Sequence, residues 1–187
     1  MQHLEPYYKW RHLYTSEEDT ASPFYGLVYS EFEFTDTIYN YYIHPQWDNF
    51  DSPTLYLKVL YADYAEGYVI IELLGEWNDA IGNDIMVLKR NVIDVMLSAG
   101  IYKFILIADN VLNFHSSDDS YYEEWHEDIE DQGGWIVMLN WPDHLQSEFK
   151  AAGIHYYIFM QQYHEWRTHE PSIVFERVED QLIKRIG

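Results

Sequence analysis

The sequence predicts an α/β fold in which helices cover a mixed, mostly parallel β-sheet, with a β-hairpin in an N-terminal extension. From residue 54 onward, short apolar runs of strand length alternate with amphipathic stretches of helical period. Parallel strands need long crossover connections, and three helix-like stretches stand between successive apolar runs. We therefore expect a domain at residues 54–187 and an aromatic-rich extension at residues 1–53.

The extension contains the predicted hairpin. The runs 27–34 and 37–43 are β-like, and the first alternates with a period of two around side chains such as Val28 and Phe32. Thr35 and Asp36 stand between the runs as turn residues. The proline-marked segment 44–53 then reads as a connector.

The elements of the domain follow in chain order. Glycines at 100, 133, 134 and 153 are expected to end the helices of the domain. Ser116 or Ser117 is expected to cap the helix that begins at about residue 118. A closing amphipathic helix is expected to follow residues 172–175. We expect strands at 54–62, 67–74, 102–108, 134–140 and 155–160, and helices at about 79–99, 118–131, 142–152 and 178–186.

The charge limits the class of partner. The 187 residues include 32 acidic and 11 basic side chains, a formal net charge of −21. Nucleic acid is not expected as a partner, because binding it relies on Lys and Arg neutralising phosphates. Anionic membrane surfaces are disfavoured for the same reason. A basic protein partner is compatible with this charge, although solubility alone also explains it.

Cysteine is absent, which excludes disulfides, thiolate metal sites and cysteine nucleophiles. The first residues have neither the basic nor the apolar region of a signal peptide, and no apolar stretch approaches the roughly 20 residues that span a bilayer. We therefore expect a bacterial cytoplasmic protein without a cofactor.

Five segments, at residues 75–80, 105–117, 132–135, 153–154 and 173–186, together resemble the STAS domain, the fold of anti-sigma factor antagonists and of the cytoplasmic tails of sulfate transporters. Residues 75–80, Gly-Glu-Trp-Asn-Asp-Ala, resemble the family's G-E-L-D turn, with Asn78 in place of its aspartate. Residues 105–117 resemble the strand and V-T-F-I-D-S-S-G loop of the family. The glycine turn at 132–135, the Gly153-Ile154 pair and the closing segment 173–186 also resemble their counterparts.

The resemblance implies a regulatory, non-enzymatic protein-interaction module with a protein partner. Many STAS domains carry a phosphoacceptor serine in this loop, and the matching position is Ser116. His115 stands where the family has an aspartate, and Asp118 where it has a glycine. Ser116 is therefore the conditional phosphoacceptor, and Asn113, His115, Ser117 and Asp118 form the loop around it.

The other constellations leave alternatives open. Nine carboxylates lie between Asp109 and Asp131 without a basic residue, which is typical of a solvated helix face but also suits a hard cation. In the segment 164–169, His-Glu-Trp-Arg-Thr-His, the second histidine falls at i+5, roughly 140° around a helix from the first, so we expect no metal site. A hydrolase would need Ser116 and His115 in hydrogen-bonding contact.

The extension offers a further alternative. Its aromatic residues could pack the hairpin, line a pocket for a small molecule or lipid, or form a homodimer surface. They are Tyr7, Tyr8, Trp10, Tyr25, Tyr29, Tyr39, Tyr41, Tyr42 and Trp47.

Overall fold

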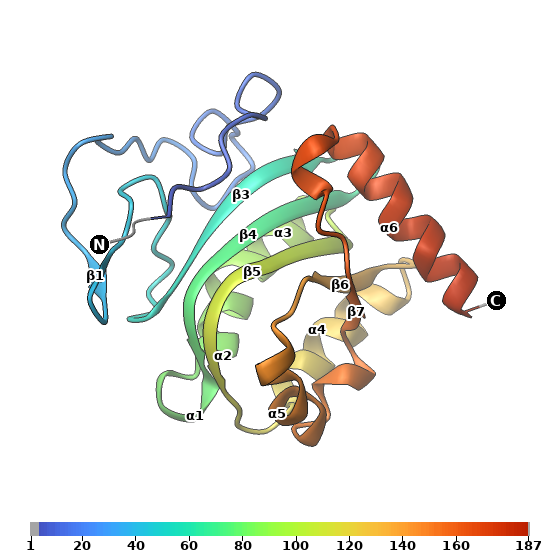
Figure 1. The fold of residues 1–187 in the computed structure, drawn as a ribbon. Helices are drawn as coiled ribbons and strands as arrows, with labels where there is room; N and C mark the ends of the chain where they lie inside the picture. The colour runs from blue at the N-terminus through green and yellow to red at the C-terminus, as the bar shows by residue number, and fades with distance from the viewer. Residues whose placement is uncertain (1–3, 187) are drawn as a thin grey trace.

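Five strands form one sheet in the order β3–β4–β5–β6–β7, as the computed structural model of residues 4–186 shows (Figure 1). β3 pairs with β4 in the antiparallel direction, and all the other neighbours are parallel. The mixed, mostly parallel sheet predicted from the sequence is therefore confirmed. The strands are β3 (Leu55–Asp63), β4 (Tyr68–Asn78), β5 (Lys103–His115), β6 (Trp135–Leu139) and β7 (Phe159–Gln161).

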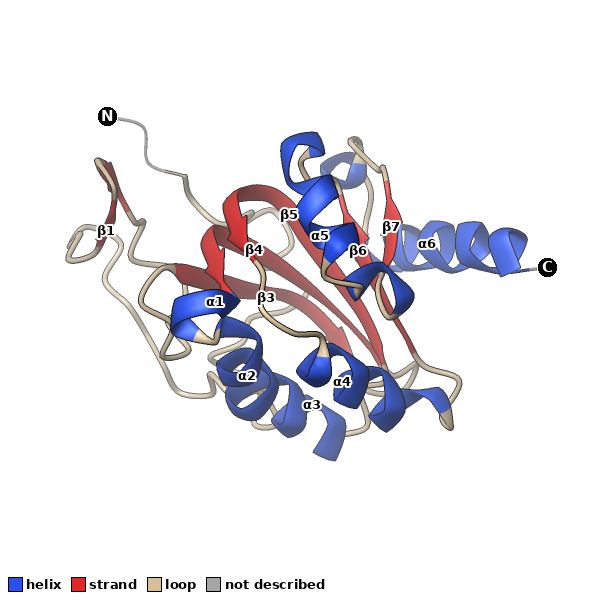
Figure 2. Ribbon diagram, turned by 90° about the horizontal axis from the view of Figure 1, so that it is seen from below, coloured by secondary structure: helices blue, strands red, loops and turns tan. Residues whose placement is uncertain are grey.

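Helices cover both faces of this sheet (Figures 1 and 2). One face packs against the helices that connect the strands, and the opposite face packs against the last helix and part of the N-terminal extension. The connecting helices are α1 (Asp79–Gly82), α2 (Asp84–Leu88), the π-helix η1 (Lys89–Ile93), α3 (Asp94–Ser98), α4 (Ser120–Glu130), η2 (Asp143–Leu145), α5 (Gln146–Ala151) and η3 (Ile154–Tyr156). The short η4 (Trp166–Thr168) precedes the last helix, α6 (Pro171–Ile186).

The central strands are apolar on both sides because both sides are covered. Val69 and Ile71 of β4 point to the layer of connecting helices, while Ile70 points to the layer of α6. Val174 and Val178 of α6 are buried on that second face. Two separate apolar layers therefore hold the sheet.

The helix predicted at 79–99 is interrupted rather than continuous. Asn83 adopts a left-handed conformation, with φ at 50°, and separates α1 from α2. The π-helix η1 then changes the helical phase a second time. Ile81 of α1 is 90% exposed, because it lies before the first interruption.

The predicted hairpin is present but lies elsewhere in the extension. β1 (Thr37–Ile38) pairs with β2 (Tyr41–Tyr42), so the turn is formed by Tyr39 and Asn40. Residues 27–34 form no strand. Val28 and Phe32 of that run are 81% and 87% exposed, so its alternating pattern has no covering layer to pack against.

Four other boundaries differ from the prediction. β5 continues past residue 108 to His115, because β4 continues beside it. The helix predicted at 142–152 divides into η2 and α5, and the strand predicted at 155–160 divides into η3 and the short β7. α6 begins at Pro171, a favourable first-turn residue, and so includes the segment 172–175.

The extension packs on the sheet. Asp48 and Lys58 form a buried ion pair at 3.4 Å, and Asp48 also bridges to Leu57 through backbone hydrogen bonds. Trp10 belongs to the apolar layer of α6, while Phe24 belongs to the layer of connecting helices. The division of the chain at residue 53 stays a prediction.

Part of the acidic run joins two helices instead of facing water. Lys89 is buried, and its Nζ lies 2.7 Å from Asp128 and 3.3 Å from Glu124 of α4, and also contacts Asp94. Arg90 bridges Asp94 and Glu124 as well. These ion pairs therefore connect the η1–α3 segment to α4.

No helix in the described part of the chain combines the length and apolarity needed to cross a membrane.

Glu72 lies in the middle of β4 and is only 1% exposed. Its Oε2 accepts a hydrogen bond from the backbone N of Tyr7 at 3.3 Å. Tyr7 and Trp10 belong to residues 6–17, which we call the strap, and both rings pack edge-on against Trp166. Burial raises the pKa of Glu72 to about 7, although Arg167 lowers it.

This burial predicts a pH dependence of stability. The native pKa of Glu72 exceeds its ordinary value of 4.5, so its contribution to stability is present below pH 4.5 and is lost as the pH rises through about 7. We expect Glu72→Gln to raise the free energy of unfolding at pH 8 by up to about 3 kcal/mol. The difference should vanish near pH 4, as measured by urea denaturation. Glu66→Gln, at an exposed acid, is the control, and a Glu72→Gln effect equal at both pH values contradicts the prediction.

Candidate functional site

An apolar cavity of about 120 Å³ lies between the hairpin and the far ends of β4 and β5. We call it the hairpin pocket. Tyr41, Tyr42 and Leu112 at its rim are 47%, 45% and 40% exposed, so the pocket opens within an exposed apolar surface. Its lining residues are Leu4, Ile38, Tyr41, Tyr42, Ile43, Leu74, Gly75 and Leu112.

The hairpin reaches this position because β4 has a glycine there. Gly75 has a φ of 118°, which side chains rarely adopt. A Cβ at this position would lie 2.2 Å from the carbonyl oxygen of Thr54 and 2.8 Å from Cδ1 of Ile38. Ile38 therefore packs directly on the backbone of β4, and this contact forms the floor of the pocket.

Tyr39 is held in an unfavourable conformation beside the pocket. Its φ is 52°, which is unusual for a bulky residue and costs on the order of 1 kcal/mol. The hydroxyl of Tyr39 donates to Oε2 of Glu76, and this bond to a carboxylate, together with burial, raises the pKa of Tyr39. The hydrogen bond therefore ties the turn of the hairpin to the sheet.

Glu76 lies at the centre of a polar group next to the pocket. Its Oε1 accepts from Nδ2 of Asn78 at 3.3 Å and lies 3.7 Å from Nε2 of His115. Nδ2 of Asn113 is 3.2 Å from the same His115 nitrogen. Tyr39, Glu76, Asn78, Asn113 and His115 form what we call the Glu76 cluster.

The pairing of two strands aligns this cluster. Glu76 is in register with Asn113, and Asn78 with His115, at the carboxyl ends of β4 and β5. Asn113 and His115, predicted as loop residues, are therefore strand residues. Open α/β folds place ligands beyond these strand ends, so the position suits a binding site.

Ser116 stands apart from the Glu76 cluster. Its backbone N and its Oγ both donate to Oε1 of Glu148, at 2.8 and 3.1 Å, and Glu148 belongs to α5. The serine hydroxyl thus bonds to a carboxylate, whereas His115 contacts Asn113 and Glu76. The contact between Ser116 and His115 that a hydrolase would need is not made in the described residues.

The expected cap of the following helix is also different. Asp119 is the N-cap of α4, and Asp118 accepts hydrogen bonds from the backbone and the hydroxyl of Ser120. These bonds lower the pKa of Asp118. Ser117 and Asp118 are exposed, and neither Ser116 nor Ser117 caps the helix, because β5 extends to His115 and shifts the turn.

Two buried carboxyl groups follow β4 that the sequence reasoning missed. Asp79 accepts from Nε1 of Trp77 at 2.9 Å, from the backbone N of Ile85 at 2.8 Å and from the hydroxyl of Tyr122 at 2.5 Å. Burial raises its pKa to about 6, because these bonds only partly offset the desolvation. The turn signal at 75–80 could have drawn attention to Asp79.

Asp84 is the second of these groups, and it completes the same turn. It accepts from the hydroxyl of Ser52 and from the backbone N of Asn78, both at 2.7 Å. Asn78 in turn caps α1 by accepting from the backbone N of Ile81 at 3.0 Å. Asparagine is as effective a helix N-cap as aspartate is. Asn78, which stands in place of the aspartate of the G-E-L-D turn, therefore keeps the capping role.

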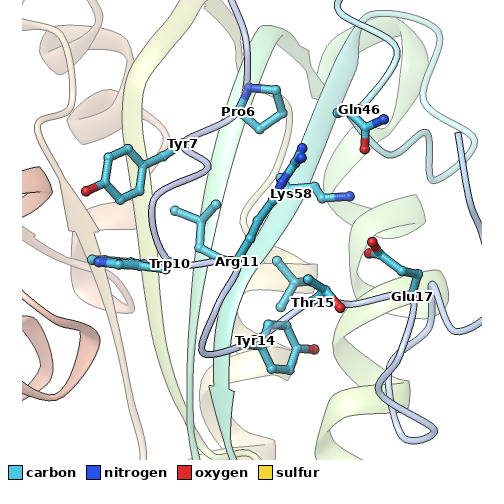
Figure 3. Close-up of a pocket in the computed structure, with 11 residues that line it drawn as sticks. Pro6, Tyr7, Trp10, Arg11, Tyr14, Thr15, Glu17, Gln46 and Lys58 are labelled. Carbon is cyan, nitrogen blue, oxygen red and sulfur yellow. The ribbon is translucent and has the colours of Figure 1, made fainter. Parts of the chain in front are cut away.

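A second hollow lies between the strap and β3, but it is small. Figure 3 shows Tyr7 and Trp10 at one side of this hollow and Lys58, Gln46 and Glu17 at the other. The cavity there has a volume of about 20 Å³. That volume suits one water molecule, so this hollow is not a ligand pocket.

The remaining candidates of the sequence do not form a common site. Trp10 and Trp47 of the aromatic set are buried packing residues, whereas Tyr39, Tyr41 and Tyr42 are exposed around the hairpin pocket. In the 164–169 segment, Trp166 is buried and His169 contacts Tyr163, the residue before the segment. Within residues 4–186, no three His, Asp or Glu side chains converge as metal ligands would.

Comparisons with known proteins find similarity in solved structures. No protein-family model and no curated protein sequence matches the chain. The anti-sigma factor antagonist SpoIIAA in its unphosphorylated form is 13% identical, with a TM-score of 0.48 over 66% of this chain and 96% of its own. The phosphorylated form of the Bacillus cell fate determinant SpoIIAA is 13% identical, with a TM-score of 0.43 over 65% and 98%.

A protein from Thermotoga maritima, described as an anti-sigma factor antagonist, is 14% identical, with a TM-score of 0.44 over 66% of this chain and 92% of its own. The observed sheet is the mixed, mostly parallel one that the sequence predicts, and the STAS-like likeness stays a resemblance of sequence segments. The TM-scores of all three structures are below 0.5, so no property of those proteins is assigned to this chain.

The contact at Gly75 predicts a large effect of a small substitution. Gly75→Ala adds a methyl group where Thr54 and Ile38 leave no space. Gly100→Ala is the matched control, because Gly100 has a φ of 92° and no atom within 4 Å of the added Cβ. We expect Gly75→Ala to lower the free energy of unfolding by about 2 kcal/mol more than the control, measured in urea. Equal effects of the two substitutions would mean that the close approach does not hold the hairpin.

Proposed function

We propose that this chain is a regulatory protein-interaction module that binds a partner protein at the hairpin pocket. The observation that carries the proposal is an apolar pocket of about 120 Å³ within an exposed surface of tyrosines. Energetically important interface residues are often aromatic and often fill small pockets on the partner. The regulatory part of the proposal goes with the resemblance of the sequence to STAS domains.

The volume of the pocket favours a protein partner over a small molecule or lipid. Small-molecule sites commonly have volumes of about 300–1,000 Å³. The hairpin pocket is well below this range and suits one inserted side chain. The exposed rings of Tyr41 and Tyr42 would then contact the partner around that side chain.

The charges around the pocket favour a basic partner. Glu76 lies beside it, Asp36 directly precedes β1, and no Lys or Arg lines the pocket among the described residues. The formal net charge of −21 adds attraction over a longer range. The expected partner therefore presents an apolar side chain flanked by Lys or Arg.

Ser116 is proposed as the conditional phosphoacceptor of this module. A phosphate there would add nearly two negative charges beside Glu148, which now accepts both hydrogen bonds of Ser116. Repulsion would separate the end of β5 from α5. Phosphorylation would thus change the structure at a defined contact.

Replacing the exposed tyrosines should remove partner binding. From an extract of cells that carry the gene, the wild type should capture one protein in an amount at least about tenfold greater than the Tyr41→Ala/Tyr42→Ala variant does. Quantitative mass spectrometry measures the capture. That protein should be basic, and its capture should weaken as salt rises, because salt screens exposed charges.

The matched control is Tyr8→Ala/Tyr25→Ala, since Tyr8 and Tyr25 are 52% and 56% exposed but do not line the pocket. Direct titration of the purified partner then measures the loss of affinity. If both double variants capture the same proteins in the same amounts, the hairpin pocket is not the binding surface. Loss of a homodimer on gel filtration would instead identify a second copy as the partner.

The switch makes a separate prediction. Ser116→Glu should lose the hydrogen bonds to Glu148 and speed hydrogen exchange in α5, whereas Ser117→Glu, at an exposed neighbour, should not. Mass spectrometry of protein from its native cells should find phosphate on Ser116. Absence of that phosphate, together with unchanged partner binding by Ser116→Glu, would exclude the switch.

A further inference from the structure

β7 leaves one side of the sheet open. It is the last strand in the sheet order, and its only neighbour among the described strands is β6 (Figures 1 and 2). An open strand presents a row of backbone donors and acceptors that another chain can pair with. The edge of β7 is therefore a possible place for an additional strand.

The direction of the backbone groups on β7 follows from two hydrogen bonds. The carbonyl of Gln161 accepts from the backbone N of Asn140, which follows β6, so Gln161 faces β6. Backbone groups alternate along a strand, so those of Met160 face the open side. The carbonyl of Met160 accepts from Nη1 of Arg185 at 3.0 Å, which confirms this direction.

A groove of about 470 Å³ runs along this edge. α5 and η3 form one wall, and Arg185 near the end of α6 forms the other. Ile158 and Met160 contribute apolar surface to its floor. The volume is large enough for several side chains of an extended segment.

The charge of the groove is opposite to that of the chain. Lys150, His155 and Arg185 line it, and no Asp or Glu does so within the described residues, although the chain has 32 acidic side chains. Neither Lys150 nor Arg185 forms an ion pair within residues 4–186, whereas buried cations such as Lys89 do. Both stand in the last turns of helices, where positive charge is favourable, and the fold brings these helix ends to the same groove.

We propose that the open edge of β7 binds an extended acidic segment of a partner protein as an added strand. An N–H of that segment would take the place of Arg185 at the carbonyl of Met160. Arg185, released from this carbonyl, and Lys150 would then pair with carboxylates of the added segment. Main-chain pairing supplies affinity in such complexes, and the side chains supply specificity. A basic segment is disfavoured by the same charges.

The test uses the full chain and three fluorescently labelled octapeptides, followed by fluorescence anisotropy. The first alternates Glu with Val. The second alternates Lys with Val. The third has the sequence of the first but carries N-methyl groups on alternate backbone nitrogens, which keeps its charge and removes donors for strand pairing. We expect saturable binding of the first peptide and binding of the other two weaker by at least about tenfold.

Two variants locate the binding on the protein. Met160→Pro removes the backbone N–H that faces the open edge, and proline is tolerated on an edge strand at such a position. Lys150→Ala/Arg185→Ala removes the cations and serves if the proline variant does not fold. Each should weaken binding of the Glu-Val peptide at least about tenfold, while Lys9→Ala, an exposed cation outside the groove, should not.

Three results would overturn the proposal. The first is the absence of saturable binding by the Glu-Val peptide. The second is equal binding of the N-methylated peptide, because charge alone would then explain the interaction. The third is a dimer of the chain in solution that Met160→Pro dissociates, because a second copy would then occupy the edge.

Discussion

The parallel pairing of β4 with β5 is the constraint on which the candidate site depends. The two strands continue together to Asn78 and His115, beyond the point where β5 leaves β6 at Ile107. Irregularities in the pairing between Glu72 and Leu74 and between Gly75 and Glu76 interrupt the regular ladder between β4 and β5. Such irregularities bend strands, and Figure 1 shows both strands curving strongly. The hairpin packs on this curved part because Gly75 allows close contact.

Local pattern was enough to predict the sheet but not its full extent. Apolar runs marked β4 and the first part of β5, because buried parallel strands are apolar on both faces. Beyond Ala108, β5 contains Asp109, Asn110 and Asn113, so its sequence reads as a loop. Only the pairing with β4 makes this part a strand, and pairing between distant residues leaves no local pattern in the sequence. For this reason the sequence does not predict that Asn113 and His115 belong to the Glu76 cluster.

The net charge follows from the composition, but the effect of each charged side chain depends on its position in the fold. Lys89 and Arg90 neutralise part of the acidic run because η1 and α4 are adjacent, which no spacing along the chain reveals. Glu72 and Asp79 are buried carboxyl groups whose pKa values are raised by desolvation. The net charge of −21 is therefore distributed unevenly over the surface. The carboxylate of Glu76 lies beside the hairpin pocket, while cations line the groove along β7.

The short helix α5 connects the candidate switch with the edge of the sheet. Glu148 of α5 accepts the hydrogen bonds of Ser116, and Lys150 of the same helix lines the groove beside β7. Residues two positions apart point to different sides of a helix, so one side of α5 faces the end of β5 and another faces the groove. A helix of six residues has little stability of its own and depends on such contacts. A change of charge at Ser116 would therefore alter the wall of the groove as well as the loop, so regulation at one place and binding at the other would act through the same helix.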